Sequence, residues 1–290
     1  MILLDAIAEN IGRVSGQRPV IRESRPITGG CINQALKISD GERSWFVKIN
    51  QAARVSMFEA EADALSEMAP SGIRVPRVVC YGVAAGQSYL VLEFIALNGT
   101  ANPLLLGQQL AGMHHLTAEQ YGWRRNNTIG STPQINTCAD DWLGFWRQHR
   151  LGFQLQLAEQ NGYGGELQDL GEALMQALPG LFDGYRPLPS MLHGDLWGGN
   201  AAALTDGTPV IFDPALYYGD RETDIAMTEL LGGFGPRFYA AYNAVWPLDA
   251  GYKHRKVLYN LYHILNHLNL FGGGYRQQAV AMMRQLLAVL

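Results

Sequence analysis

The chain has 290 residues, of which 48% are hydrophobic and 17% are charged, and its formal net charge is −4. This balance is typical of a folded globular protein of one or two domains and excludes a disordered chain. Acidic residues outnumber basic ones and no basic run is present, which argues against a nucleic-acid partner.

No run of 18 or more apolar residues occurs, so we expect no membrane span. The first 16 residues carry Asp5 and Glu9 and predict an amphipathic helix, not a signal peptide. The three cysteines are odd in number and share no metal-like spacing. Together these features predict a cytoplasmic protein with reduced thiols.

The first third of the chain has the pattern of a sheet interrupted by one helix. A helix is expected over about 55–68, closed by Pro70 and Gly72. Segments with strand character, ended by glycine-containing turns, lie at 20–28, 33–38, 43–50, 75–83 and 87–95.

From about residue 98 the pattern changes to helical periodicity, which we see at 104–116, 139–160, 167–178 and 254–271. Only 201–212 interrupts these helices, as a short hairpin. We therefore expect an α+β, two-lobed fold. Its β-rich nucleotide-binding lobe spans residues 1–94, and a mostly helical catalytic lobe spans 95–290.

Three polar residues around that hairpin form a set that suits phosphoryl transfer. Asp195 and Asn200 lie in "HGDLWGGN", and Asp213 follows the apolar strand "PVIF". One carboxylate can deprotonate a hydroxyl, while an amide oxygen and a second carboxylate hold Mg²⁺ on nucleotide phosphates. Each residue alone is equally explained as a turn former, but all three in this order favour a kinase site.

Lys48 gives independent support from the first lobe. It lies in the apolar strand "WFVKIN" and is one of only four lysines. Kinase-type folds hold such a lysine against the nucleotide phosphates with a helix glutamate. Glu61 shares a helix face with Leu65 and Met68 and is the expected partner, whereas Glu59 lies on a more polar face.

The turn "TGGCIN" could hold phosphate oxygens through its backbone N–H groups, although a plain hairpin turn explains it equally well. Its candidate residues are Gly29, Gly30, Cys31, Ile32 and Asn33. Cys31 could link two chains by a disulfide, but an inert thiol is the simpler interpretation.

Several motifs resemble the fructosamine kinase (ketosamine 3-kinase) family, which is related to aminoglycoside and choline kinases. They are "LHGDLWGGN", "IFDPALYYGDRETDIAM", "MFEAEADAL", "TIGSTPQINT" and the C-terminal "YNLYHILNHLNLFGGGY". The resemblance covers nearly the whole chain. It implies a protein-kinase-like fold that uses ATP and Mg²⁺ to phosphorylate the 3-hydroxyl of ketosamines. The resulting 3-phosphates are unstable and release the amine, which makes the activity a deglycation repair.

The resemblance also assigns roles. Asp195 would be the catalytic base, Asn200 and Asp213 the metal ligands, and Lys48 with Glu61 the phosphate-binding pair. The hinge residues Glu93, Phe94 and Ile95 would meet adenine, and Asp224 would anchor the catalytic loop. The substrate side would include Trp197, as a stacking platform for the sugar or as a packing residue, with His193 and Tyr217.

Alternatives remain open. A kinase for aminoglycosides or another amino alcohol would need a carboxylate-rich pocket, to which Asp220 and Glu222 could contribute. A nucleotide-binding pseudokinase should lack one of the lysine, base or metal ligands, and none is missing. His263 and His267 have the spacing of zinc ligands but are better explained by packing. Asp140 and Asp141 are explained as an N-cap pair. We expect a monomer whose substrates are small ketosamines or glycated lysines of proteins.

Overall fold

The computed structural model describes residues 3–28 and 32–290, and the chain divides into two compact units. Unit 1 runs up to Asn102 and includes Ala202–Pro214, and unit 2 consists of Pro103–Ala201 and Ala215–Leu290. The boundary expected between residues 94 and 95 differs from this division. The reason is a set of backbone hydrogen bonds that join 99–102 to the 203–207 segment, including Gly99 N to Ala203 O at 3.1 Å.

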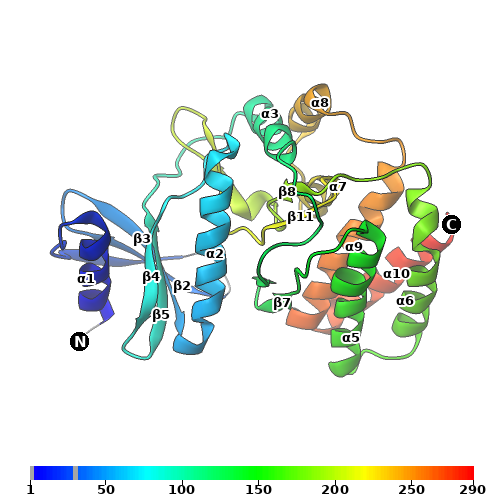
Figure 1. The fold of residues 1–290 in the computed structure, drawn as a ribbon, viewed down its shortest axis with the longest axis horizontal. Coiled ribbons are helices and arrows are strands. Elements are labelled where there is room, and N and C mark those ends of the chain that lie inside the picture. The colour runs from blue at the N-terminus through cyan, green and yellow to red at the C-terminus, as the bar shows by residue number, and fades with distance from the viewer. Residues whose placement is uncertain (1–2, 29–31) are drawn as a thin grey trace. The chain divides into compact units, whose positions relative to one another are not determined.

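Unit 1 is built on an antiparallel sheet (Figure 1). In the described part of the chain its strand order is β1-β2-β3-β5-β4. The strands are β1 (Glu23–Ile27), β2 (Gln34–Ser39), β3 (Ser44–Gln51), β4 (Val78–Ala84) and β5 (Gln87–Glu93). Each of them lies within, or within one residue of, a segment for which the sequence predicted a strand.

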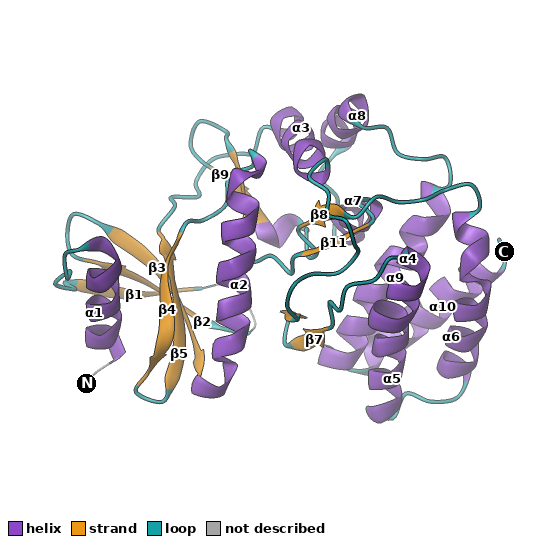
Figure 2. Cartoon of the chain, viewed as in Figure 1, coloured by secondary structure: helices purple, strands orange, loops and turns teal. Residues whose placement is uncertain are grey.

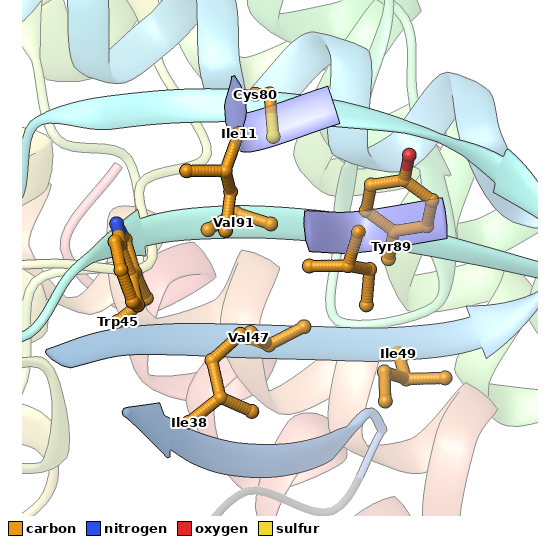
Figure 3. Packing of buried hydrophobic residues seen from close by; sticks show 9 residues of the cluster. Ile11, Ile38, Trp45, Val47, Ile49, Cys80, Tyr89 and Val91 are labelled. Carbon is orange, nitrogen blue, oxygen red and sulfur yellow. The ribbon is translucent and has the colours of Figure 1, made fainter. Parts of the chain in front are cut away.

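Two helices cover opposite faces of this sheet (Figure 2). Helix α1 (Leu3–Ser15) buries Ile7 and Ile11 against one face. Alternate β3 residues Trp45, Val47 and Ile49 belong to the same apolar cluster, which Figure 3 shows. Because side chains alternate along a strand, Lys48 points to the other face, where α2 (Val55–Met68) packs on β4 and β5.

Unit 2 is mostly helical, as expected. Its helices are α3 (Pro103–His114), α4 (Trp142–Trp146), α5 (Gly152–Gln160), α6 (Glu166–Ala177), α7 (Glu222–Leu230), α8 (Pro236–Val245), α9 (Tyr252–Phe271) and α10 (Arg276–Leu287). Helix α9 is buried on almost every side over residues 258–266 and packs against α5, α7 and α10. Helices α3 and α8 lie side by side (Figure 1).

The N-cap interpretation holds for one of the two aspartates before α4. Asp141 Oδ2 accepts the N–H of Gly144 at 2.6 Å, which is an N-cap contact. Asp140 instead accepts a hydrogen bond from Gln120 at 2.8 Å. None of the helices in the described residues is long and apolar enough to cross a membrane.

Short strands interrupt the helices after residue 103 in more places than the sequence predicted, and the hairpin among them belongs to unit 1 except for Ala201. The expected hairpin is present as β9 (Ala201–Ala203) and β10 (Pro209–Ile211). However, β6 (Asn127–Ile129) also pairs with β7 (Thr132–Gln134), and β8 (Ser190–Leu192) pairs with β11 (Tyr217–Gly219). Strands of three residues are too short for alternation to be recognised in a sequence.

Candidate active site

Lys48 lies in unit 1 between two carboxylates. Its Nζ is 2.6 Å from Glu61 Oε1 and 2.6 Å from Asp213 Oδ1, so the expected pairing with Glu61 is confirmed. Burial disfavours the ammonium, but the charges of Asp213 and Glu61 outweigh burial and raise the pKa of Lys48. Burial raises the pKa of Glu61, and Lys48 opposes that rise. The lysine is therefore held as a cation at a fixed position.

Asp213 has an unusual backbone for an aspartate. It follows β10 with a φ of 59°, in the left-handed region that non-glycine residues seldom adopt. Strained conformations of this kind concentrate at functional sites. Within the described chain only its Oδ1 is paired with protein, and the side chain is 45% exposed. The second carboxylate oxygen, Oδ2, thus remains open to another ligand.

In unit 2 the loop His193–Asn200 follows β8 and is fixed by Asp224 of α7. Asp224 Oδ2 accepts the N–H of His193 at 2.7 Å, and Oδ1 accepts that of Gly194 at 2.8 Å. Burial would raise the pKa of Asp224, but its hydrogen bonds, foremost the one with His114, lower it overall. The expected role of Asp224 as an anchor of this loop is confirmed.

A glycine is required where the loop turns. Gly194 has a φ of 81°, and a Cβ there would lie 2.1 Å from Ala215 O. Ala215 N also donates to His193 O at 2.8 Å. The loop therefore packs backbone to backbone on the segment that begins at Ala215.

Asp195 and Asn200 are brought together within this loop. Asn200 Nδ2 donates to Asp195 O at 2.8 Å and to Asp195 Oδ2 at 3.1 Å. Because the amide nitrogen is used in this way, Asn200 Oδ1 faces away from these contacts and has no hydrogen bond in the described part of the chain. An amide oxygen is a suitable ligand for Mg²⁺.

The tryptophan of the loop folds over its own backbone. A Cβ on Gly199 would lie 2.3 Å from two ring atoms of Trp197, so the indole lies directly across Gly199. Trp197 is only half-buried, which leaves part of it exposed to solvent.

A buried chain of hydrogen bonds leads from Arg221 to Asp224. Arg221 Nη1 donates to Tyr242 Oη at 3.0 Å, and Tyr242 Oη lies 2.7 Å from His114 Nδ1. His114 Nε2 lies 3.1 Å from Asp224 Oδ2. Burial lowers the pKa of His114, so the ring is neutral and its one proton belongs on Nε2, facing the carboxylate. We call this series, Arg221–Tyr242–His114–Asp224, the buried relay.

The family model for fructosamine kinase matches residues 3–289. The chain belongs to the fructosamine kinase family. It is therefore an enzyme, a phosphotransferase.

Members of the fructosamine kinase family are similar to the chain over nearly its full length. A probable ketoamine kinase of Synechocystis is 49% identical over 288 residues, which is 98% of this chain and 96% of that protein. The chloroplastic protein-ribulosamine 3-kinase of Arabidopsis thaliana is 43% identical over 280 residues, covering 95% of this chain and 86% of its own.

Solved structures place the family in the protein-kinase-like fold. A Haemophilus somnus protein assigned as a fructosamine-3-kinase has a TM-score of 0.89 and 31% identity, with 97% of this chain and 96% of that chain covered. A thermostable mutant of the aminoglycoside phosphotransferase APH(4)-Ia has a TM-score of 0.63 at 12% identity over 97% of this chain and 98% of its own, which shows a shared fold alone.

Two family residues expected at the substrate are buried instead. Tyr217 is 2% exposed and packs on Phe145 and under the guanidinium of Arg150, 4.1 Å from its ring. His193 is also buried, and its Nδ1 accepts the N–H of Asp195 at 3.2 Å. Both expected substrate contacts are therefore wrong. His193 shapes the loop, as its hydrogen bond indicates, and Tyr217 belongs to the core of unit 2.

The hinge and the glycine turn are partly described. Glu93 N donates to Arg77 O at 2.9 Å, so this N–H is not available to a nucleotide. The N–H groups of Phe94 and Ile95 make no hydrogen bond in the described residues. In the turn, Asn33 Oδ1 accepts from Asn50 at 2.7 Å, and Ile32 is 40% exposed.

Three turn residues, Gly29, Gly30 and Cys31, lie outside the described residues.

The zinc-like spacing of His263 and His267 does not form a metal site in the described residues, 3–28 and 32–290. No group of three or more His, Cys, Asp or Glu side chains there could hold a metal ion by itself. Burial lowers the pKa of His263 to about 3, which fits the packing interpretation. His267 lies in a ring cluster with Phe271 and Tyr275.

Proposed function

We propose that this enzyme transfers the γ-phosphoryl group of ATP to the 3-hydroxyl of a ketosamine. Membership of the fructosamine kinase family supports the reaction, and the names of the ketoamine and ribulosamine kinases support the substrate class. One observation carries the assignment of the catalytic loop. Asp195 and Asn200 are hydrogen-bonded to each other in a loop that Asp224 fixes through two backbone N–H groups.

The nucleotide is assigned to unit 1. Lys48, held by Glu61, supplies the positive charge for the phosphates, and Phe94 and Ile95 supply N–H groups for adenine. Related aminoglycoside phosphotransferases have been solved with ADP or an ATP analogue, which is compatible with ATP as the donor. The turn residues Ile32 and Asn33 belong to the same phosphate-binding turn in this proposal.

Asn200 Oδ1 and Asp213 Oδ2 are the oxygens that would hold Mg²⁺. Both are free of protein partners in the described chain, and the ion prefers one or two such ligands together with phosphate oxygens and water. When bound, Mg²⁺ supplies neutralisation of the phosphate charge.

Asp195 is the general base. It accepts the proton of the 3-hydroxyl as the sugar oxygen forms its bond to the γ-phosphorus, and the bond to the bridging oxygen breaks to release ADP. The exposed part of the Trp197 indole offers an apolar surface to the C–H face of the sugar. The ketosamine 3-phosphate then decomposes and releases the amine. The substrates are small ketosamines or glycated lysines of proteins.

The test combines a substrate panel with one variant. ADP release is measured with fructosamines, ribulosamines, erythrulosamines and aminoglycosides. We expect turnover of a ketosamine and loss of about 10²–10⁴-fold in kcat for Asp195→Asn, with ATP–Mg²⁺ binding retained. Asp183→Asn, an exposed change of the same kind in unit 2, should leave kcat unchanged.

Each other outcome contradicts a defined part of the proposal. Turnover that survives Asp195→Asn would remove the assigned base. Preference for an aminoglycoside would change the substrate class, and nucleotide binding without any turnover would indicate a pseudokinase. A cytoplasmic location and a monomeric state are further parts of the proposal. They rest on the sequence, as does a disulfide-linked dimer through Cys31, and size-exclusion chromatography with and without reductant tests both states.

A further inference from the structure

Unit 2 contains a cavity of about 240 Å³ that is separate from the catalytic loop. It is lined by residues 185–188, Asp220, Arg221 and Trp246. None of the residues from His193 to Asn200 belongs to its wall. The proposed function gives this cavity no role.

Arg221 is a buried cation on the cavity wall that forms no ion pair with a carboxylate in the described residues. It is only 5% exposed, and its guanidinium lies 4.1 Å from the ring of Trp246. Three of its hydrogen bonds go to neutral oxygens, namely Tyr242 Oη at 3.0 Å, Trp246 O at 3.1 Å and Pro247 O at 2.6 Å. A guanidinium carries five N–H groups, so two remain without an acceptor in the described chain. The guanidinium therefore keeps donors that can bind an oxyanion in the cavity.

The carboxylates nearby are committed to other donors. Asp220 accepts from Tyr185 Oη at 3.0 Å, from Tyr259 Oη at 2.5 Å and from Glu222 N at 3.0 Å. Glu222 is held by Arg255 through two hydrogen bonds of 2.7 and 3.0 Å.

The second arginine of the wall, Arg186, is exposed and has no carboxylate within ion-pair distance in the described residues. The cavity therefore presents two guanidinium groups, while its one carboxylate is already hydrogen-bonded.

We propose that this cavity is a binding site for a small oxyanion, the carboxylate or phosphate group of a small solute. Arg221 supplies the buried charge and Arg186 closes the site from the solvent side. Trp246 and Tyr185 form its aromatic walls.

Arg221 is also the first member of the buried relay, which ends at the two loop amides held by Asp224. An anion that draws on the guanidinium changes the hydrogen bond to Tyr242. The site is therefore coupled to the loop that carries Asp195.

Hydrogen–deuterium exchange tests the site without any use of kinase activity. Wild type, Arg186→Ala and Arg237→Ala are compared in sodium phosphate, sodium acetate and sodium chloride at equal ionic strength. Arg237 is exposed on α8 outside the cavity wall, so its variant carries the same charge change.

We expect phosphate or acetate, but not chloride, to slow exchange at 185–188 and at the amides of His193 and Gly194. Arg186→Ala should raise the anion concentration needed for this protection by at least about fivefold, while Arg237→Ala should not raise it. The anion that acts at the lower concentration identifies the preferred group. Equal protection in all three proteins, or none at 185–188, would overturn the site. Protection at 185–188 with no change at 193–194 would overturn the coupling.

Discussion

The anchor of the catalytic loop gives the sharpest prediction, which is the effect of Asp224→Asn. The aspartate accepts the N–H groups of His193 and Gly194 on different oxygens and also faces His114. An asparagine keeps one oxygen, so its NH₂ group must face one of the two loop amides. That change removes one hydrogen bond to a charged acceptor and leaves one buried N–H unpaired.

Hydrogen bonds to charged groups contribute about 1.5–3 kcal/mol, and an unpaired buried donor costs about 1–3 kcal/mol. These costs overlap, because part of the lost bond is the desolvation of the same N–H. We expect Asp224→Asn to lower the free energy of unfolding by about 2–4 kcal/mol, or roughly 30- to 1000-fold in the folding equilibrium. The turnover number should fall as well, because the loop that holds Asp195 is no longer fixed in position.

Urea unfolding followed by tryptophan fluorescence measures the stability, and kcat is measured at a temperature where the variant is folded. Asp183→Asn is the matched control and should change neither quantity. The pKa of Asp224 is lowered by the fold, so its stabilisation is complete above its ordinary pKa of 3.8 and is lost as pH falls through the lower value. A loss below about 0.5 kcal/mol with a normal kcat would refute the reasoning, since surface changes have effects of that size.

Three further changes test other parts of the structure. Gly194→Ala should destabilise the enzyme by about 2–5 kcal/mol and reduce kcat, because a residue in the left-handed region must then carry a Cβ that meets a carbonyl oxygen. The control is Gly198→Ala, whose Cβ would meet nothing within 4 Å. Equal urea midpoints for the two variants would contradict the close contact between Gly194 and Ala215. His263 is neutral when folded because burial lowers its pKa to about 3, so its contribution to stability is full above the ordinary value of 6.5 and is lost as pH falls toward 3. His263→Asn should therefore reduce the loss of stability between pH 7 and 4 by up to about 1.4 kcal/mol per pH unit. The control His254→Asn, on the same helix, should not reduce it. Parallel curves of unfolding free energy against pH for wild type and His263→Asn would refute the prediction. Glu61→Gln should raise the KM for ATP about tenfold with little change in the KM for the ketosamine, and an unchanged KM for ATP would remove Glu61 from nucleotide binding.

Much of the fold and part of the site could be predicted because the signals were local. The apolar run around Lys48 indicated a strand, and the i, i+4 spacing after Glu61 indicated the face that meets Lys48. The spacing of Asp195 and Asn200 within one loop predicted that they act together, and the structure brings them into hydrogen-bond contact.

The parts that were missed depend on contacts between distant segments. His114 and Tyr242 are 128 residues apart, and in the sequence each reads as an ordinary core residue at the end or middle of an apolar helix. Tyr217 was misassigned because a motif shows which residues are present but not which face of a short strand each one occupies. In β11, Tyr217 points into the core and Tyr218 is only half-buried.

The triad of Lys48, Glu61 and Asp213 has a consequence for the order in which ligands assemble. One ammonium lies between two carboxylates at 2.6 Å, so the resting cluster carries an excess negative charge when all three are ionised. A polyphosphate that approaches without a counter-cation must displace Asp213 from the lysine and then remain beside it, with like charges opposed. A cation that arrives with the phosphates gives the displaced carboxylate a new partner at the same moment. In the proposed nucleotide site, the charges of this triad would therefore favour the magnesium complex of a nucleotide over the bare nucleotide.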